Sequence, residues 1–456
     1  MTSTRQSHTT HAGRAAGGSL REVVALATPV ILQQISATTM GVVDSAMVGR
    51  LGPTELASVG FGSIWLWTIF SFFYGTATGV QTFVSQYDGA GRQRESGAWI
   101  WQGLYALVPG ALVVVLIAGP LVPTLLALLG PSDEMQGAAA AYVGARLPGE
   151  IAFAGLMVCT SFYRGIGDTR TPMLITFGAN ILNAVLDYGL IFGKLGLPEW
   201  GVAGAGTATA ISSVLAAVVF LMLVRRPRLA ARFETGWVAP DRSAIRRLLR
   251  VGVPIGGQWC VGMTSFAFFT TLVARMGDES MAASQAFVML LSMSFMQAVG
   301  ISVAASTLVG RYVGARDLEG ARRSFRSSLT LGVLLGIVVA ALFVALPGPL
   351  LRIFTDDPTV VSLGRPLLII GAVFQLFDAI AIITEGALRG AGDTRWPFVI
   401  ETFFGWGVFV PLAYTLGIVL DGGLAGAWIG GAISLALSSA ALYWRFRTGA
   451  WERARI

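Results

Sequence analysis

The chain has 456 residues, of which 54% are hydrophobic and only 12% are charged, and its formal net charge is +7. Soluble domains carry about 25% charged residues, so this composition indicates an integral membrane protein. The two histidines, His8 and His11, precede the first apolar segment, and Lys194 is the only lysine. These counts exclude a lysine-containing phosphate loop, a histidine metal cluster and a Ser/His/Asp catalytic set, so we expect no enzyme activity, no metal and no cofactor.

The first 20 residues are polar and lack the apolar core of a signal peptide, so they predict a disordered cytoplasmic tail. Apolar runs of about 20 residues, the length that crosses a bilayer as a helix, then follow one another along the chain. We predict an all-α membrane protein with twelve transmembrane helices. Their expected spans are 23–46, 60–86, 98–127, 140–163, 172–193, 203–224, 250–273, 280–310, 327–350, 363–388, 397–417 and 423–444.

The two halves of the chain repeat each other. RGIGDTRTP at 164–172 recurs as RGAGDTRWP at 389–397, a shift of 225 positions that also places Pro29 on Pro254. We interpret the two turns as structural caps at the cytoplasmic base of each half, with six helices per half. The predicted domains are a tail at 1–20, an N-lobe at 21–225, a basic cytoplasmic linker at 226–248, a C-lobe at 249–445 and a cytoplasmic tail at 446–456.

Basic residues are distributed unevenly among the loops. If both termini lie in the cytoplasm, 26 of the 32 Lys and Arg residues fall on the cytoplasmic side, eight of them between Arg225 and Arg250. Short loops rich in Lys and Arg stay on that side of the membrane. We therefore predict a multi-pass protein of the cell inner membrane with both termini cytoplasmic, and we attribute the positive charge to topology and not to nucleic-acid binding.

Six carboxylates lie within the predicted helices. An ionised side chain at the centre of a membrane helix costs about 2.5–3.5 kcal/mol on insertion scales, so each is a candidate for function. None has an acidic counterpart at the 225-residue shift, whereas the prolines and turns do, which favours a functional reading of the acids. They are Asp44, Glu150, Asp187, Asp378, Glu385 and Glu401.

Asp187 has the most polar surroundings of the six. Asn180 and Asn183 lie seven and four residues before it, on the same helical face. Amide and carboxylate oxygens in such a stripe can coordinate a small cation, and the alternative is a polar cluster that joins two helices. Asp44 is either functional or paired with Arg50, and we favour function.

The remaining acids divide by their distance from basic residues. Glu150 follows Arg146 by one turn, so a structural ion pair is favoured there. Asp378 and Glu385 share one helical face, and Arg389 is expected to pair with Glu385, which leaves Asp378 as the stronger candidate. Glu401 is either functional or reaches Arg395 or the membrane interface. Secondary candidates are Glu385, Gln375, Gln33 and Gln258.

These motifs resemble the multidrug and toxic compound extrusion (MATE) family over residues 21–445. The resemblance rests on VDSAMVGRLG at 43–52, YDGAGR at 87–92, the two RGxGDTRxP turns, the NxxxD at 183–187 and FQLFDA at 374–379. It implies two six-helix lobes about a pseudo-twofold axis and efflux of drug-like cations in exchange for H⁺ or Na⁺. It also implies an N-lobe cation site of Asp44, Asn183 and Asp187, more loosely with Thr209, and a C-lobe carboxylate at Asp378. Where NorM-type members carry a C-lobe glutamate, this chain has Gly262.

We therefore expect an antiporter in which ion and substrate exclude each other at Asp44, Asn180, Asn183, Asp187, Thr209 and Asp378. H⁺ is favoured over Na⁺, and a sodium ion would be held by Asp44, Asn183 and Asp187. The expected partners are small organic cations and membrane lipids, with the protein as a monomer. The alternatives are a lipid-linked oligosaccharide flippase of the same superfamily, which would need a cationic cavity, or a channel or structural membrane protein.

Overall fold

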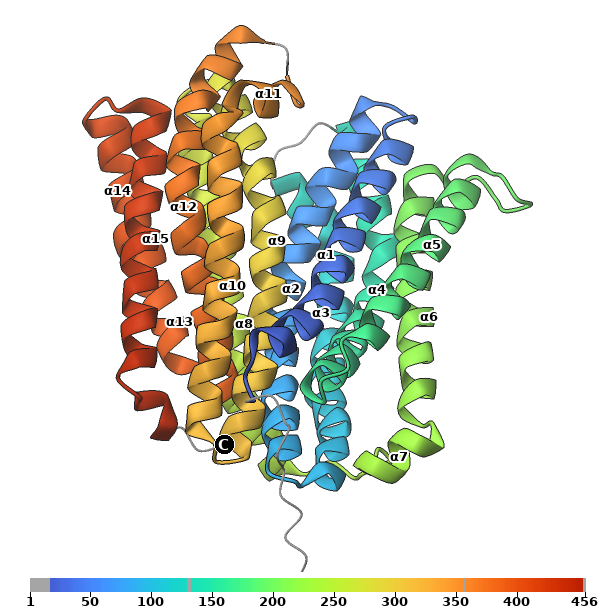
Figure 1. Cartoon of the computed structure of the whole chain (residues 1–456). Helices are drawn as coiled ribbons and strands as arrows, with labels where there is room; N and C mark the ends of the chain where they lie inside the picture. Colours follow the sequence, from blue (N-terminus) through green and yellow to red (C-terminus); the bar gives the residue numbers. More distant parts are fainter. Residues whose placement is uncertain (1–16, 129–132, 356, 454–456) are drawn as a thin grey trace, which may run out of the picture.

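The computed structural model describes residues 17–128, 133–355 and 357–453, and in these ranges every regular element is a helix (Figure 1). Most of the predicted tail lies outside them. The long helices of the first half are α1 (Leu20–Val48), α2 (Pro53–Gly89), α3 (Ala98–Leu128), α4 (Asp133–Gly165), α5 (Arg170–Phe192) and α6 (Gly201–Val224). Those of the second half are α8 (Arg242–Ala274), α9 (Asp278–Gly314), α10 (Leu318–Ala345), α12 (Pro358–Ala391), a composite helix that begins with α13 (Arg395–Thr402), and α15 (Gly423–Arg447).

Shorter elements connect or extend these helices. They are α7 (Pro227–Phe233), α11 (Pro347–Arg352), α14 (Val410–Tyr414), η1 (Gln93–Gly97), η2 (Phe403–Phe409), η3 (Thr415–Val419) and η4 (Ala450–Arg453). The segments α13, η2, α14 and η3 run on without a break, and η2 and η3 are π-helical. One membrane-length helix therefore extends from Arg395 to Val419.

Eleven helices in the described part of the chain are long and apolar enough to cross a membrane. The remaining predicted span, 250–273, lies in α8, which is long but more polar. The span predicted at 327–350 starts inside its helix, α10, but runs past the end of it. The helix begins at Leu318, because the Asp317 carboxylate caps it by accepting a bond from Gly320 N at 2.8 Å, and it ends at Ala345, because α11 starts at Pro347. Hydropathy misses the first turns because they are rich in arginine.

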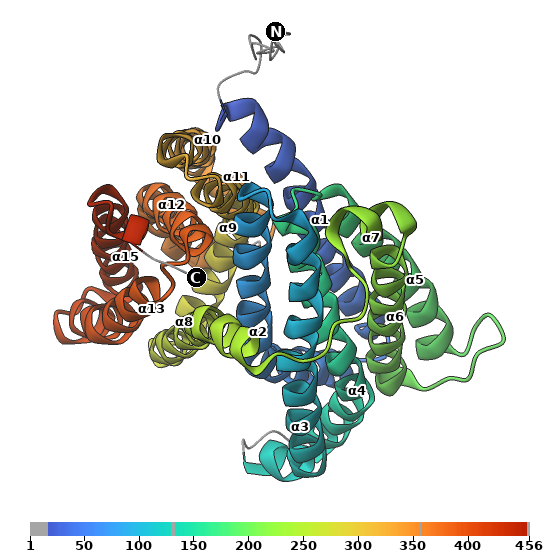
Figure 2. The same ribbon diagram turned by 90° about the horizontal axis from the view of Figure 1, so that it is seen from below.

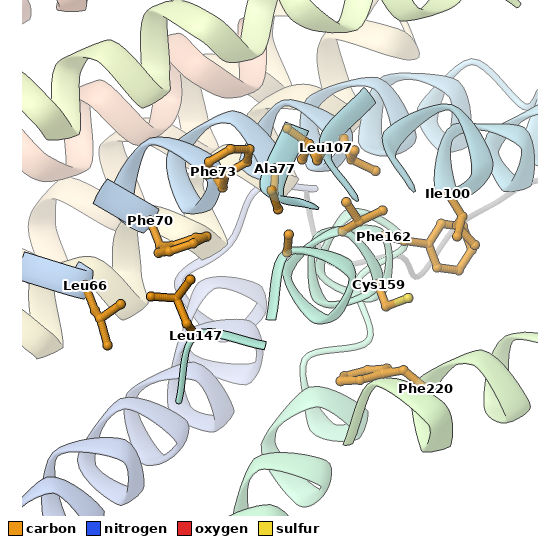
Figure 3. Close-up of a cluster of buried hydrophobic side chains, with 14 of the residues drawn as sticks. Leu66, Phe70, Phe73, Ala77, Ile100, Leu107, Leu147, Cys159, Phe162 and Phe220 are labelled. Carbon is orange, nitrogen blue, oxygen red and sulfur yellow. The ribbon is translucent and has the colours of Figure 1, made fainter. Parts of the chain in front are cut away.

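The first six and the last six long helices form two bundles that lie side by side (Figures 1 and 2). In the first, α4 packs against α2, α3 and α6; in the second, α12 packs against α9, α10 and α15. The bundles meet where α2 packs on α8 and α9, and where α1 packs on α9. Aromatic side chains such as Phe70, Phe162 and Phe220 fill the core of the first bundle (Figure 3).

Several segments rich in basic residues lie at the same end of the molecule. Arg323 and Ser327, near the start of α10, donate to the carbonyls of Gly17 and Gly18, just before α1, at 3.0 and 2.8 Å. Arg322 forms an ion pair with Glu452 of η4. The starts of α1 and α10 and the end of the described chain are therefore neighbours.

The repeated turns join α4 to α5 and α12 to α13. Gly167 and Gly392 take positive φ angles of 82° and 91°, a region that glycine enters without steric cost. The Asp168 carboxylate accepts bonds from the backbone N–H groups of Arg170 and Thr171 at 3.1 and 3.0 Å, which fixes the first turn of α5. Both turns are thus structural, as the repeat predicts.

Candidate functional site

Two acidic residues from different helices meet inside the first bundle. Asp44 of α1 and Asp187 of α5 lie within hydrogen-bonding distance of each other, and Asp187 is 0% exposed. Asn183, one turn before Asp187, donates from Nδ2 to Asp187 Oδ2 at 2.9 Å. The Oδ1 atoms of both aspartates are buried and accept no bond from any residue that the structure describes. Two carboxyl groups in contact without a donor between them need a shared proton or a bound cation.

The other predicted members of this site have different partners. Asn180 donates from Nδ2 to Ser36 Oγ of α1 at 2.7 Å, so it joins helices and does not touch the aspartates. Thr209 donates to the carbonyl of Ala205 in its own helix at 3.1 Å. The contacts of the described residues therefore join Asp44, Asn183 and Asp187, and the bond from Thr209 leaves its oxygen lone pairs available.

Arg146 of α4 is a basic residue close to this acidic pair. It bonds the Glu150 carboxylate at 3.1 Å and the Tyr142 hydroxyl at 2.6 Å, which confirms the predicted structural pair. Its charge also acts on Asp44. Arg50, the other possible partner of Asp44, forms no ion pair with it in the described chain.

Gln33 of α1 makes a bridge from this region toward the second bundle. Its Nε2 donates to Thr176 Oγ1 of α5 at 2.9 Å, and its Oε1 accepts from the buried Arg164 guanidinium of α4 at 3.0 Å. Arg164 in turn lines a cavity of about 230 Å³ between the bundles. Gln33 therefore connects α1, the helix that also carries Asp44, to Arg164 in the cavity wall.

The cavity is lined by residues of α2, α4, α8, α9, α12, α13 and α15. Tyr74, Trp259 and Phe295 supply aromatic surface, and the rings of Tyr74 and Trp259 meet edge to face with centroids 5.2 Å apart. These rings come from three helices, with Tyr74 in α2, Trp259 in α8 and Phe295 in α9. Asp44 and Asp187 do not line the cavity, whereas Asp378 does, so the N-lobe residues and the C-lobe carboxylate lie in two separate places.

Three acidic residues of the second half face this cavity. The Glu385 carboxylate lies 3.5 Å from Arg389, as the spacing of the two residues predicts, and Gln258 lines the same cavity. Asp378 and Glu401 have no ion pair or hydrogen bond in the ranges that the structure covers, although they lie close enough to Glu385 for their charges to interact. Two of the three carboxyl groups are thus free to meet a positively charged molecule.

Glu401 is the site residue that the sequence left undecided. It lines the cavity and makes no ion pair with Arg395 in the described chain. Its Oε1 lies 3.6 Å from the point where a Cβ on Gly262 would stand. The carboxyl group from α13 therefore lies next to Gly262 of α8, and this proximity results from the packing of two segments distant in sequence. Gln375 is buried but lies outside the cavity lining.

A seam of polar contacts closes the space between the bundles at the end that carries the repeated turns. Arg311 of α9 pairs with Asp88 of α2 at 3.1 Å and donates to the Ile166 carbonyl of α4 at 3.1 Å. Gln86 donates to the Gly390 carbonyl of α12 at 2.9 Å. We call these residues the interlobe seam. Nearer the other end, no hydrogen bond joins residues 53–70 to residues 278–295 in the described structure.

Among the described residues, no three His, Cys, Asp or Glu side chains are grouped closely enough to hold a metal ion. The two places of interest are therefore a carboxyl pair with an amide neighbour, suited to a proton or a monovalent cation, and an acidic, aromatic cavity. The first can exchange a small ion, and the second can bind an organic cation.

Comparison with known proteins places these features in a family. The family model MatE matches residues 29–189 and again 254–415, so its two matches begin at the repeated prolines. The chain is 32% identical over 439 residues to a probable multidrug resistance protein NorM of Thermotoga maritima, covering 96% of this chain and 94% of that protein. It is 31% identical to the multidrug resistance protein MdtK of Pectobacterium atrosepticum, covering 94% of this chain and 95% of that one.

Solved structures agree in fold. A crystal structure of MATE in the straight conformation superposes with a TM-score of 0.88 at 20% identity, covering 96% of this chain and 97% of that chain. The eukaryotic MATE transporter AtDTX14 gives a TM-score of 0.86 at 20% identity, covering 96% and 98%. The all-helical prediction is confirmed by both.

Proposed function

Because the chain belongs to the MatE family and is a multidrug efflux transporter, we propose that it exchanges organic cations for protons, with Asp44 and Asp187 as the proton site. The observation that carries this proposal is the contact between the two carboxyl groups without a donor between them. One shared proton turns that contact from repulsion into a hydrogen bond. Loss of the proton leaves two buried charges that repel each other.

Helix α1 connects the protonation state of Asp44 and Asp187 to the rest of the molecule. It carries Asp44, packs against α9 of the other bundle, and holds Gln33 against Arg164 of the cavity wall. Repulsion between Asp44 and Asp187 displaces α1 from α5, which changes its contacts with α9 and with Arg164 together. Proton binding and the shape of the cavity are therefore linked, as an antiporter requires.

We propose that the cavity is the substrate site. Asp378 and Glu401 supply unpaired carboxyl groups, and Tyr74 and Trp259 supply ring faces and edges, which together suit a flat organic cation. The volume of about 230 Å³ is below the roughly 300–1,000 Å³ of sites for drug-sized molecules, so the bundles must separate further to enclose one. The names of the relatives favour this reading over a flippase.

The orientation and the domain division belong to the same proposal. We propose that α1–α6 and α8–α15 move as two lobes, that both termini are cytoplasmic, and that the protein works as a monomer. The clustering of Arg322, Arg323 and the end of α15 at one end supports the orientation, because basic segments stay in the cytoplasm. The interlobe seam then closes the cytoplasmic side.

Uptake of a fluorescent organic cation into proteoliposomes tests the proposal, with a pH gradient and a Na⁺ gradient applied separately. We expect the pH gradient alone to drive uptake, and Asp44→Asn and Asp187→Asn each to abolish it, because an asparagine cannot release a proton. Asp278→Asn, at an exposed helix start, is the matched control and should retain full uptake.

Two results would overturn parts of this assignment. Uptake driven by a Na⁺ gradient at constant pH would mean that the same oxygens hold sodium. Full pH-driven uptake by both asparagine variants would remove the first bundle from coupling and leave the acids of the cavity as the ion site.

A further inference from the structure

A second cavity, of about 530 Å³, lies at the end of the first bundle that carries the repeated turn. Its walls are the α4–α5 turn, the end of α6 and the short helix α7, which Figure 2 draws beside α5 and α6. It shares no lining residue with the cavity between the bundles. The transport mechanism above gives it no role.

Three arginines line this cavity: Arg226, Arg228 and Arg232. All three are exposed, and within the described chain none of them forms an ion pair. Arg232 is held in place by a bond from Nε to Gln93 Oε1 at 3.1 Å and by the Phe233 ring, whose centroid lies 4.9 Å from its guanidinium carbon. Guanidinium groups bind phosphate through paired, charge-assisted bonds.

The one acidic residue in the lining, Asp168, already accepts hydrogen bonds from its own turn. Asp168 accepts bonds from the backbone N–H groups of Arg170 and Thr171 and from the Thr171 hydroxyl, the last at 2.6 Å. Its carboxylate therefore stabilises the turn. The cavity lining carries three positive charges and one negative charge. The charge balance favours an anionic ligand.

The apolar surroundings identify the kind of anion. Leu223 and Leu229 line the cavity, and Phe233 forms a buried base for it. Next to Leu223, Met222 near the end of α6 is 64% exposed, as apolar side chains at a membrane surface are. A lipid whose phosphate binds the arginines can thus place its acyl chains along α6. A free phosphate has no such chains.

The other half of the chain offers an internal comparison. Asp393, the repeat counterpart of Asp168, accepts a bond from Arg445 Nε at 2.8 Å, and the Arg445 guanidinium carbon lies 4.9 Å from the centroid of the Trp396 ring. There the protein's own side chains supply both the arginine and the aromatic cover. In the first half, the three arginines of the cavity come from the linker. Within the described chain no acidic side chain forms an ion pair with them.

We propose that this cavity binds the headgroup of an anionic phospholipid, with Arg226, Arg228 and Arg232 around its phosphate. The proposal is independent of the coupling ion and of the substrate site, since it uses none of their residues. Basic pockets at the ends of membrane helices suit such headgroups, because each basic residue adds attraction to the anionic surface.

The test is native mass spectrometry of the purified protein with phosphatidylglycerol or phosphatidylcholine of identical acyl chains. We expect wild type to bind phosphatidylglycerol at least about tenfold more tightly than phosphatidylcholine. The triple variant Arg226→Gln, Arg228→Gln, Arg232→Gln should lose this preference. The corresponding triple lysine variant should keep most of it, which separates lost charge from misfolding. Arg447→Gln, an exposed arginine at the end of α15 and outside the cavity, is the control and should bind as wild type does.

Three outcomes would overturn the proposal. They are equal affinity of wild type for the two lipids, an unchanged preference in the triple glutamine variant, and displacement of phosphatidylglycerol by excess inorganic phosphate, which would indicate a site for a free anion.

Discussion

Adding one methyl group to the interlobe seam should open it. Gly89 of α2 and Gly314 of α9 are repeat counterparts, and each lies against backbone of the facing helix: a Cβ on Gly89 would overlap the carbonyl oxygen of Arg311. No rotamer can relieve that overlap, because both partners are main chain. In Gly89→Ala the two helices must therefore move apart by more than about 1 Å, since non-bonded carbon atoms keep roughly 3.5–4.0 Å apart.

The cost of this separation can be estimated from the contacts it breaks. Moving α2 from α9 stretches the ion pair of Asp88 and Arg311, now at 3.1 Å, and the bond from Gln86 to the Gly390 carbonyl, now at 2.9 Å. Overpacking a close contact costs about 1–3 kcal/mol. That free energy shifts the equilibrium between closed and open seam by roughly 5- to 150-fold. A carrier must close this seam once in each cycle, so transport should fall by at least about fivefold.

Distance measurement across the seam is the direct assay. Spin labels at Ala90→Cys and Ala315→Cys, repeat counterparts that follow the two glycines, would report the separation in a background without Cys159 and Cys260. Gly89→Ala should shift the distance distribution to longer values. Gly60→Ala, in the same helix with no atom within 4 Å of the added Cβ, should leave both distance and transport unchanged. An unaltered distribution with full transport in Gly89→Ala would refute this account of the seam.

Other substitutions test the two sites and the topology. Asp187→Asn should reduce transport more than Asp378→Asn at equal protein levels, because other carboxyl groups share the cavity with Asp378; a larger loss at Asp378 would shift coupling to the second lobe. Glu401→Gln should raise the KM for an organic cation with little change in its maximal rate, since Glu401 faces the cavity and not the proton pair; an unchanged KM would contradict that role. Gly236→Cys should react with an impermeant thiol reagent only after the membrane is opened, and labelling of intact cells would reverse the orientation.

The sequence predicted the helices and part of the N-lobe site for identifiable reasons. Apolar runs and the 225-residue repeat locate the helices, because a membrane span needs a fixed length of apolar residues. The contact of Asn183 with Asp187 follows from their spacing within one helix. That Asp44 is their partner was implied by the family resemblance, since the meeting of α1 with α5 cannot be deduced from periodicity.

What the sequence missed depends on packing between distant helices. Glu401 occupies the space beside Gly262 because α13 packs on α8, and no local pattern relates these two positions. Asn180 shares a face with Asp187, yet its amide bonds Ser36 instead, because α1 presents a nearer hydroxyl. Periodicity also could not predict that the carboxyl pair and the cavity are two different sites, since both contain acidic residues on apolar helices.

Proton release by the purified protein reports directly on the carboxyl pair. When an organic cation is added in detergent, at fixed ionic strength and without sodium, we expect wild type to release protons and Asp44→Asn and Asp187→Asn each to release fewer. Sodium added alone should release few protons. Undiminished release from both single variants would contradict the assignment of Asp44 and Asp187 as the proton site.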